Sequence, residues 1–323
     1  MSVRVAVVGA GAIGAACAAW LRDAGADVRV LDPGAGRAAA SWAAAGLLLA
    51  GAGHDWPAPW HAMARRSMEL WPEIARRHPE IELRRIGLIL LGDAPLTVAW
   101  RRREGFACEP VEWRGRPALR FPEVEAIRPH RLAPALLRGL PVEPTAVGPL
   151  DPLLAAHDAV VVASGAWASA HLRDQGLDLD VRPVRGQMMI FDGGDLDAAL
   201  YEAAGEEVAV PRADGRVVVG TTVEDAGFEA VTHEADLAPL EAWARREIPA
   251  LGRREDAWAG LRPGTGRLLP TVGWAAPGVV VAVGHYRNGI LLAPATGELV
   301  ADLILGRAPR LDPVPFAPPA GPA

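Results

Sequence analysis

Residues 3–14 read VRVAVVGAGAIG, and this stretch decides the fold of the chain. Its apolar run ends at Gly9, and the residues that follow at 12–24 have a helical composition. A second apolar run at 27–31 completes a strand–helix–strand unit. Because a buried parallel strand reads as a continuous apolar run, the pattern predicts a Rossmann-like half at the N-terminus.

The glycines at Gly9, Gly11 and Gly14 form a G-x-G-x-x-G pattern between the predicted strand and helix. The first glycine permits a tight turn, the second lets a pyrophosphate approach the backbone, and the third lets the helix pack closely. Amides at a helix N-terminus favour the phosphate charge. Asp32 ends the second strand, where a carboxylate can accept hydrogen bonds from ribose hydroxyls. The motif predicts dinucleotide binding without choosing between NAD and FAD.

The composition excludes several classes of protein. The chain has 323 residues, 50% of them hydrophobic and 22% charged, as in an ordinary globular protein. Its 33 basic residues are all arginine, which excludes enzymes that depend on a pyridoxal-phosphate, P-loop or kinase lysine. The net charge of −6 argues against binding to nucleic acid.

Two apolar stretches, at 5–21 and 38–53, are expected to form buried core and not a membrane segment. The two cysteines give no disulfide framework, so we expect a cytoplasmic protein. His54 and His61 lack the spacing of metal ligands, and no metal site is expected.

Strands and helices alternate along the rest of the chain. We expect strands at 85–91, 159–163, 186–191, 207–210, 216–223 and 279–283, and helices at 58–77, 94–104 and 290–305. Asp214 and Gly215 predict a hairpin turn. Residues 308–323 include six prolines and are expected to be extended or disordered. The pattern predicts an α/β fold (α+β overall), in which a mixed or antiparallel-sheet domain is inserted into a discontinuous nucleotide-binding domain.

Residues 37–48 read RAAASWAAAGLL, a run of small residues that opens a predicted helix. Small side chains let a flat ring or a phosphate lie against the backbone. An alanine-rich packing helix is the alternative interpretation.

Four further motifs carry a resemblance to a known family. Residues 161–167 read VVASGAW, 184–187 VRGQ, 258–265 WAGLRPGT and 284–294 GHYRNGILLAP. With the small-residue run, they resemble the D-amino-acid oxidase superfamily, and its glycine oxidase branch most of all. The resemblance extends over most of the chain in order. It implies an FAD-binding domain formed by 1–50, 140–180 and 255–307, a substrate domain formed by 51–139 and 181–254, and a Pro-rich tail at 308–323.

The resemblance also implies the cofactor and its contacts. Ala12 and Ile13 would lie along the pyrophosphate, Asp32 and Pro33 at the adenosine ribose, and 285–291 under the flavin. A helix starting at Gly289 would bring positive dipole to the pyrimidine edge, where reduced flavin is anionic. The full set expected at non-covalently bound FAD is Gly9, Gly11, Ala12, Ile13, Gly14, Asp32, Pro33, Ala40, Ser41, Ala45, Gly46, Leu47, His285, Tyr286, Arg287, Asn288, Gly289, Ile290 and Leu291.

Arg262 and Arg287 match the substrate-side arginines of the family. A guanidinium binds a carboxylate through two parallel hydrogen bonds, which a lysine cannot do. Both arginines are expected in loops rich in glycine or proline, and pairing with a protein carboxylate is the alternative role.

The implied reaction is hydride transfer from the α-carbon of a small amino acid or amine (glycine, sarcosine or a D-amino acid) to the flavin, with O2 giving H2O2. A dehydrogenase or tailoring enzyme for a larger secondary amine, and a degenerate non-catalytic flavoprotein subunit, remain alternatives. The relatives act in thiamine precursor formation or amino-acid catabolism. A homo-oligomer is compatible with the resemblance, and the lack of lysine removes one device by which such flavoproteins promote reaction with O2.

The chain departs from the family pattern at three places. Val208 stands where glycine oxidases carry a tyrosine, and Val223 where a methionine is expected. Only 13 residues separate Pro144 from Asp158, where relatives have further strands, one of them in contact with adenine. The first two changes predict a larger or less polar substrate pocket, and the third predicts an altered adenine site.

Overall fold

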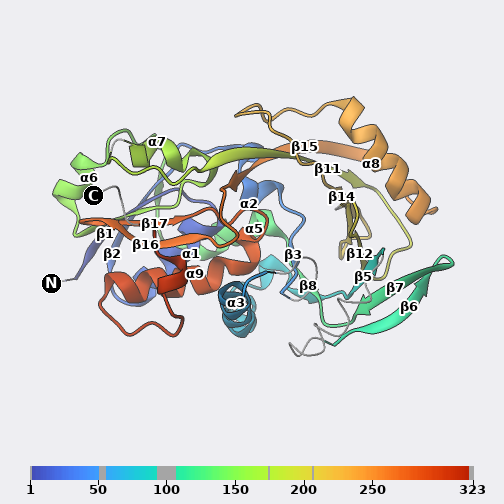
Figure 1. The fold of residues 1–323 in the computed structure, drawn as a ribbon, viewed down its shortest axis with the longest axis horizontal. Helices are drawn as coiled ribbons and strands as arrows, with labels where there is room; N and C mark the ends of the chain where they lie inside the picture. Colours follow the sequence, from blue (N-terminus) through green and yellow to red (C-terminus); the bar gives the residue numbers. More distant parts are fainter. Residues whose placement is uncertain (1, 51–55, 93–106, 174, 206, 320–323) are drawn as a thin grey trace.

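The computed structural model describes residues 2–50, 56–92, 107–173, 175–205 and 207–319 (Figure 1). The helix predicted at 94–104 lies outside these residues. The described part contains two large sheets, one on each side of the molecule in Figure 1, and a small third sheet.

The first sheet has the Rossmann-like arrangement that the N-terminal sequence predicts. Its strands are parallel, apart from β16, which runs antiparallel to β17. Val7 of the central strand faces Val161 on one side and Val30 on the other. In order across the sheet, the strands are β16 (Thr271–Ala276), β17 (Val279–Val283), β10 (Ala159–Val162), β1 (Arg4–Val8), β2 (Asp27–Leu31) and β9 (Val142–Glu143).

Helices cover both faces of this sheet. Val5 and Val7 pack with helices α1 (Ala12–Asp23) and α9 (Gly289–Ile304), whereas Ala6 and Val8 pack on the opposite side. A Cβ on Gly297 of α9 would lie 2.8 Å from the backbone carbonyl of Ala16 in α1, so these two helices meet backbone to backbone. The other helices are α2 (Ala40–Ala43), α3 (Ala58–Arg77), α5 (Pro129–Leu136), α6 (Asp151–Ala156), α7 (Ala168–Arg173) and α8 (Glu234–Glu247).

The second sheet is mostly antiparallel, and α8 covers one of its faces through Leu237, Leu240 and Trp243. The predicted hairpin turn at Asp214 and Gly215 is confirmed, because Arg212 and Arg216 on either side of it are hydrogen bonded. In order, the strands are β15 (Arg254–Gly264), β11 (Arg182–Phe191), β14 (Val217–Gly220), β13 (Val208–Pro211), β12 (Ala199–Glu202), β5 (Leu88–Leu91), β7 (Arg116–Phe121) and β6 (Glu109–Trp113).

The long strands β11 and β15 run side by side between the two halves of the molecule (Figure 1). The domain boundary expected at residue 255 falls inside β15, whose residues pair with β11 in the second sheet. The division into two domains stays a prediction at these boundaries.

Two predictions, those about the strand at 85–91 and about the C-terminal tail, were wrong. The single strand expected at 85–91 is divided by Gly87, whose φ is +70°: β4 (Arg84–Arg85) joins β3 (Leu47–Leu48) and β8 (Glu125–Ala126) in the third sheet, whereas β5 joins the second. The Pro-rich tail is packed as far as the structure describes it. Phe316 is only 1% exposed, and the guanidinium of Arg267 donates to the carbonyls of Pro315 and Ala317.

Among the helices of the described residues, none combines the length and the apolar composition that a membrane-spanning helix requires.

We predict that Phe316→Ala lowers the free energy of unfolding by about 3–5 kcal/mol, because it leaves a cavity beneath the tail. Urea unfolding measures the effect. Val314→Ala is the matched control, since Val314 is 75% exposed and its truncation should change stability by less than about 0.5 kcal/mol. Equal effects of the two substitutions would contradict the packed tail.

Candidate functional site

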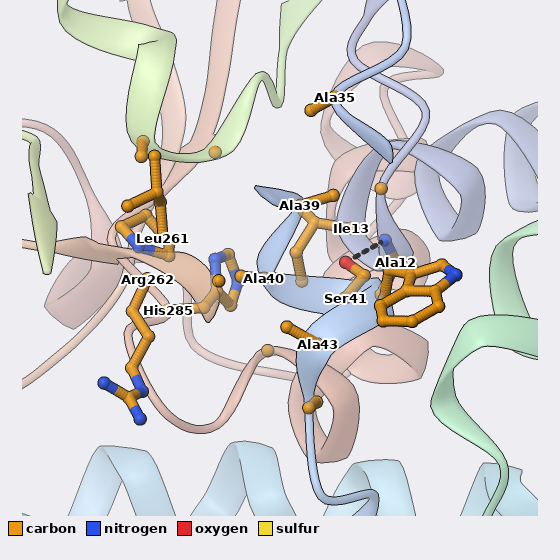
Figure 2. Close-up of a pocket in the computed structure, with 18 of the residues that line it drawn as sticks. Ala12, Ile13, Ala35, Ala39, Ala40, Ser41, Ala43, Leu261, Arg262 and His285 are labelled. Carbon is orange, nitrogen blue, oxygen red and sulfur yellow. Dashed lines mark hydrogen bonds between the residues drawn. The ribbon is translucent and has the colours of Figure 1, made fainter. Parts of the chain in front are cut away.

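A cavity of about 810 Å³ opens at the carboxyl ends of β1, β2 and β10 and extends to β15. Ligands of open α/β sheets bind at this edge. Figure 2 shows the small side chains Ala39, Ala40 and Ala43 between the start of α1 and β15. The cavity therefore brings the N-terminal motif together with segments far along the chain.

Glycine is required where β1 turns into α1. Gly9 has φ of +109°, and a Cβ there would lie 2.5 Å from the carbonyl oxygen of Ala163. A Cβ on Gly14 would lie only 1.9 Å from the carbonyl oxygen of Gly9. Both contacts are to backbone, so no neighbouring side chain can move to relieve them, and the geometry agrees with the roles that the sequence predicts.

The N-terminus of α1 faces the cavity through Gly11, Ala12 and Ile13. The Ala12 amide donates to Ser41 Oγ at 2.8 Å, which ties the small-residue segment to the start of the helix (Figure 2). Asp32 accepts hydrogen bonds from the amides of Ala10 and Gly34, each at 2.6 Å. These bonds fix the carboxylate at the edge of the cavity.

The small-residue segment forms a single helical turn, α2, and continues in an extended conformation, so the helix expected to open there is short. Gly46 has φ of +81°, and a Cβ there would lie 2.3 Å from the Ile127 carbonyl oxygen. Arg212 donates to the carbonyls of Ile127 and Ala45 and clamps this turn. Burial lowers the pKa of Arg212 to about 10, because a charged guanidinium is costly away from water.

The loop before α9 forms the opposite wall, and Tyr286 there has φ of +49°. Because Thr296 Oγ1 donates to the Leu292 carbonyl, it accepts from His285 Nε2, 2.9 Å away. Burial lowers the pKa of His285 to about 3, so the imidazole is neutral at physiological pH. The first turn of α9, whose Gly289 and Ile290 line the cavity, also brings positive potential to this wall.

Arg262 lies on strand β15, and the expectation of a loop was wrong at this position. Near Arg262, β11 pairs with β15 without a bulge, and this pairing holds the Arg262 backbone in place. The Arg262 side chain lies over Gly186, where a Cβ would lie 2.0 Å from Nη2. Nη1 donates to the carbonyls of Arg185 at 3.2 Å and Thr222 at 3.1 Å, and Nη2 donates to the Thr221 hydroxyl. These three bonds orient the guanidinium on the cavity wall.

The structure brings together nearly all the residues that the sequence assigns to the site. Arg262 and Arg287 line the same cavity, and Arg287 lies in the turn before α9. Of the expected set only Gly14 and Leu291 do not line it, because Gly14 packs against Gly9 and Leu291 is buried in the core.

Sequence reasoning missed Met188, Tyr201 and Thr221, which line the cavity near Arg262. Tyr201 is one of two tyrosines in the chain, the one signal that could have identified it. Val208 also lines this wall and is 6% exposed, whereas Val223 is 50% exposed and lies outside the cavity.

Comparison with known proteins identifies the family to which this chain belongs. The family model for FAD-dependent oxidoreductases of the DAO type matches residues 4–303. The chain belongs to this family. It is 33% identical to glycine oxidase of Pseudomonas putida over 368 residues, covering 98% of this chain and 99% of the relative. It is 31% identical to glycine oxidase of Bacillus licheniformis over 343 residues, covering 93% and 92%.

The crystal structure of glycine oxidase from Geobacillus kaustophilus matches the whole of both chains with a TM-score of 0.88 and 28% identity. The protein is accordingly an FAD-dependent amino-acid oxidoreductase of the DAO family.

The residues that line the cavity fit FAD. Ser164 Oγ is buried at the cavity wall and has no hydrogen-bond partner among the described residues, so a ligand can satisfy it. The glycine turn leaves bare backbone at the start of α1, where a pyrophosphate requires close approach.

Residues 144–158 form the segment in which the sequence predicts an altered adenine site. Between β9 and β10 the described residues 144–158 contain the helix α6 and no strand. The alignment with the Pseudomonas putida enzyme spans 368 residues, more than the 323 of this chain, so that relative carries segments which this DAO family member lacks. Ala146 and Val147 line the cavity here.

We predict that the buried, neutral His285 makes stability depend on pH. The unfolded chain binds a proton near pH 6.5, whereas folded His285 does so only near pH 3, so the free energy of unfolding falls as the pH drops through this window. We expect urea unfolding between pH 7.5 and 5 to show that the free energy of unfolding depends less steeply on pH in His285→Gln than in the wild type, by up to about 1.4 kcal/mol per pH unit.

His157→Gln is the control, because His157 is only half-buried and lies away from the cavity. An unchanged slope in His285→Gln would contradict the burial of a neutral imidazole.

Proposed function

We propose that this protein oxidises the α-carbon of a small amino acid (glycine, sarcosine or a D-amino acid), with O2 as the electron acceptor. The observation that carries the proposal is the Arg262 guanidinium, held on the cavity wall by two carbonyls and a hydroxyl. Held in this position on the cavity wall, a guanidinium can bind a substrate carboxylate through two parallel hydrogen bonds. The glycine oxidase activity of the relatives supports the same substrate class.

In this proposal the FAD pyrophosphate lies at Ala12 and Ile13, the ribose at Asp32, and the ring between the small-residue segment and the loop before α9. The flavin, when bound, supplies the hydride acceptor. The residues proposed to hold it are those that line the cavity: Gly9, Gly11, Ala12, Ile13, Asp32, Pro33, Ala40, Ser41, Ala45, Gly46, Leu47, His285, Tyr286, Arg287, Asn288, Gly289 and Ile290.

The chain contributes mainly position and electrostatics. Arg262 and Arg287, which line the same cavity, orient the carboxylate so that the α-carbon faces the ring. Met188, Tyr201 and Val208 form a largely apolar wall that excludes water. The first turn of α9 stabilises negative charge that develops at the pyrimidine edge, a task that the neutral His285 cannot perform.

The reaction balances without a catalytic base on the protein. The substrate amine enters neutral, loses a hydride from its α-carbon and a proton from nitrogen, and leaves as an imine that water hydrolyses. Two electrons and two protons then convert O2 to H2O2.

A second candidate is a dehydrogenase that passes the electrons to another acceptor. It is favoured by the absence of lysine, since no lysine ammonium can assist O2 beside the ring. Parallel assays of H2O2 release and of dye reduction, with glycine, sarcosine and D-alanine, separate the two. Stoichiometric H2O2 supports the oxidase, and dye turnover without H2O2 would establish the dehydrogenase instead.

We predict that Arg262→Lys raises KM for the amino-acid substrate by about 10- to 100-fold while FAD stays bound, because a lysine keeps the charge but loses the fork. Arg254→Lys is the matched control, since Arg254 lies on the same strand and pairs with Glu234 at the surface. Stopped-flow flavin reduction measures both variants. If the KM for the amino-acid substrate were unchanged in Arg262→Lys, Arg262 would not be a residue that binds the substrate carboxylate.

A further inference from the structure

A second cavity of about 450 Å³ adjoins the flavin cavity. Four residues line both cavities: Trp56, His285, Tyr286 and Asn288. The two spaces therefore share the wall formed by the loop before α9.

Arg262 lies at the border between them. Thr221, which accepts from its Nη2, lines the flavin cavity, whereas Val223, two residues later, lines the second cavity. Thr222, between these two residues, accepts from Nη1 through its carbonyl. On the paired strand, Val184 is directly opposite Arg262 and also lines the second cavity. A ligand whose carboxylate is bound at Arg262 would thus lie in the flavin cavity, next to the residues that line the second cavity.

The second cavity offers apolar surface that the fold itself does not use. Val223 is 50% exposed and Leu268 is 65% exposed, although both are large apolar residues. The Trp56 ring stacks on buried Trp60, with ring centroids 5.2 Å apart and an interplanar angle of 15°. Apolar surface gathered in a concave site is typical of ligand binding.

The charged groups in this cavity are already compensated or open to water. Glu224 accepts from Arg185 Nε at 2.6 Å and from Gln187 Nε2 at 2.7 Å. Arg267 is exposed to water, and its guanidinium donates to carbonyls of the C-terminal tail. Arg182 and Asp225 are exposed and opposite in sign. The cavity therefore favours an uncharged group over an ionic one.

We propose that the second cavity is a substrate subsite for an apolar or aromatic substituent, so that the preferred substrate is a substituted amino acid larger than glycine. The inference rests on the proposed function, because it takes the carboxylate to be bound at Arg262. The substituent lies against Val184, Val223 and Trp56, and the hydride transfer itself is unchanged.

Binding of non-oxidisable analogues to the FAD-loaded protein tests the subsite without turnover. In (methylthio)acetate and (benzylthio)acetate, sulfur replaces the amine, and flavin absorbance reports their Kd. We expect the benzyl compound to bind about tenfold more tightly or better, from burial of its ring.

Val223→Trp, which fills the cavity, should remove this preference. Val231→Trp is the matched control, because Val231 is 47% exposed on the same segment and lines neither cavity; it should retain the preference. Equal affinity of the two analogues in the wild type, or an unaltered preference in Val223→Trp, would overturn the subsite. If neither analogue perturbs the flavin, the carboxylate site of the proposed function fails, and the subsite fails with it.

Steady-state turnover of two larger substrates shows whether the substituent is carried by the nitrogen or by the α-carbon of the substrate. N-Benzylglycine extends from nitrogen and D-phenylalanine from the α-carbon. We expect kcat/KM for at least one of them to exceed that for glycine by tenfold in the wild type and to fall to the glycine value in Val223→Trp. A higher kcat/KM for glycine than for both would overturn the inference. If the analogues bind as expected but no amine reduces the flavin, the subsite stands and the proposed oxidation is wrong.

Discussion

The geometry of the site depends on a few glycines, where the lack of a side chain lets two backbone segments pack directly against each other. Gly14 packs on the carbonyl of Gly9, and Gly297 packs on the backbone of Ala16. These contacts hold α1 and α9 against the sheet and against each other, and both helices begin at the same cavity. Two helix N-termini therefore face one cavity, and in the proposed function their dipoles would favour the pyrophosphate and the reduced ring of FAD.

The same constraint operates between the two halves of the molecule. Gly260 on β15 lies against Ala43 of α2, where a Cβ would come within 2.3 Å of the Ala43 Cβ. On the paired strand, Gly186 leaves room for the Arg262 guanidinium. The pairing of β11 with β15 thus holds Arg262 in a fixed position relative to the small-residue segment. In the proposed function, the position of the substrate relative to the flavin therefore depends on this pairing of strands.

Local patterns predict much of this arrangement, and long-range pairing explains what they miss. The turn at Gly9, the first helix and Asp32 are encoded within one short stretch, which is why they could be predicted. The strand that carries Arg262 resembles a loop in sequence, because Gly260, Pro263 and Gly264 are uncommon in strands; its pairing with residues about 80 positions earlier is not visible in the local pattern. Tyr201 and Phe316 carry no local signal, since their burial is decided by partners that are distant in sequence.

Anaerobic reduction of the bound flavin is the most direct test of the central claim that Arg262 and the cavity beside it bind an amino acid for oxidation by FAD. The FAD-loaded protein would be mixed without O2 with glycine, sarcosine, D-amino acids and N-benzylglycine, and the visible absorbance of the flavin followed. The account predicts saturable bleaching by at least one of these compounds, with no bleaching by the corresponding amines that lack a carboxylate. A protein that takes up no FAD, or a flavin that none of the amino acids bleaches, would contradict it.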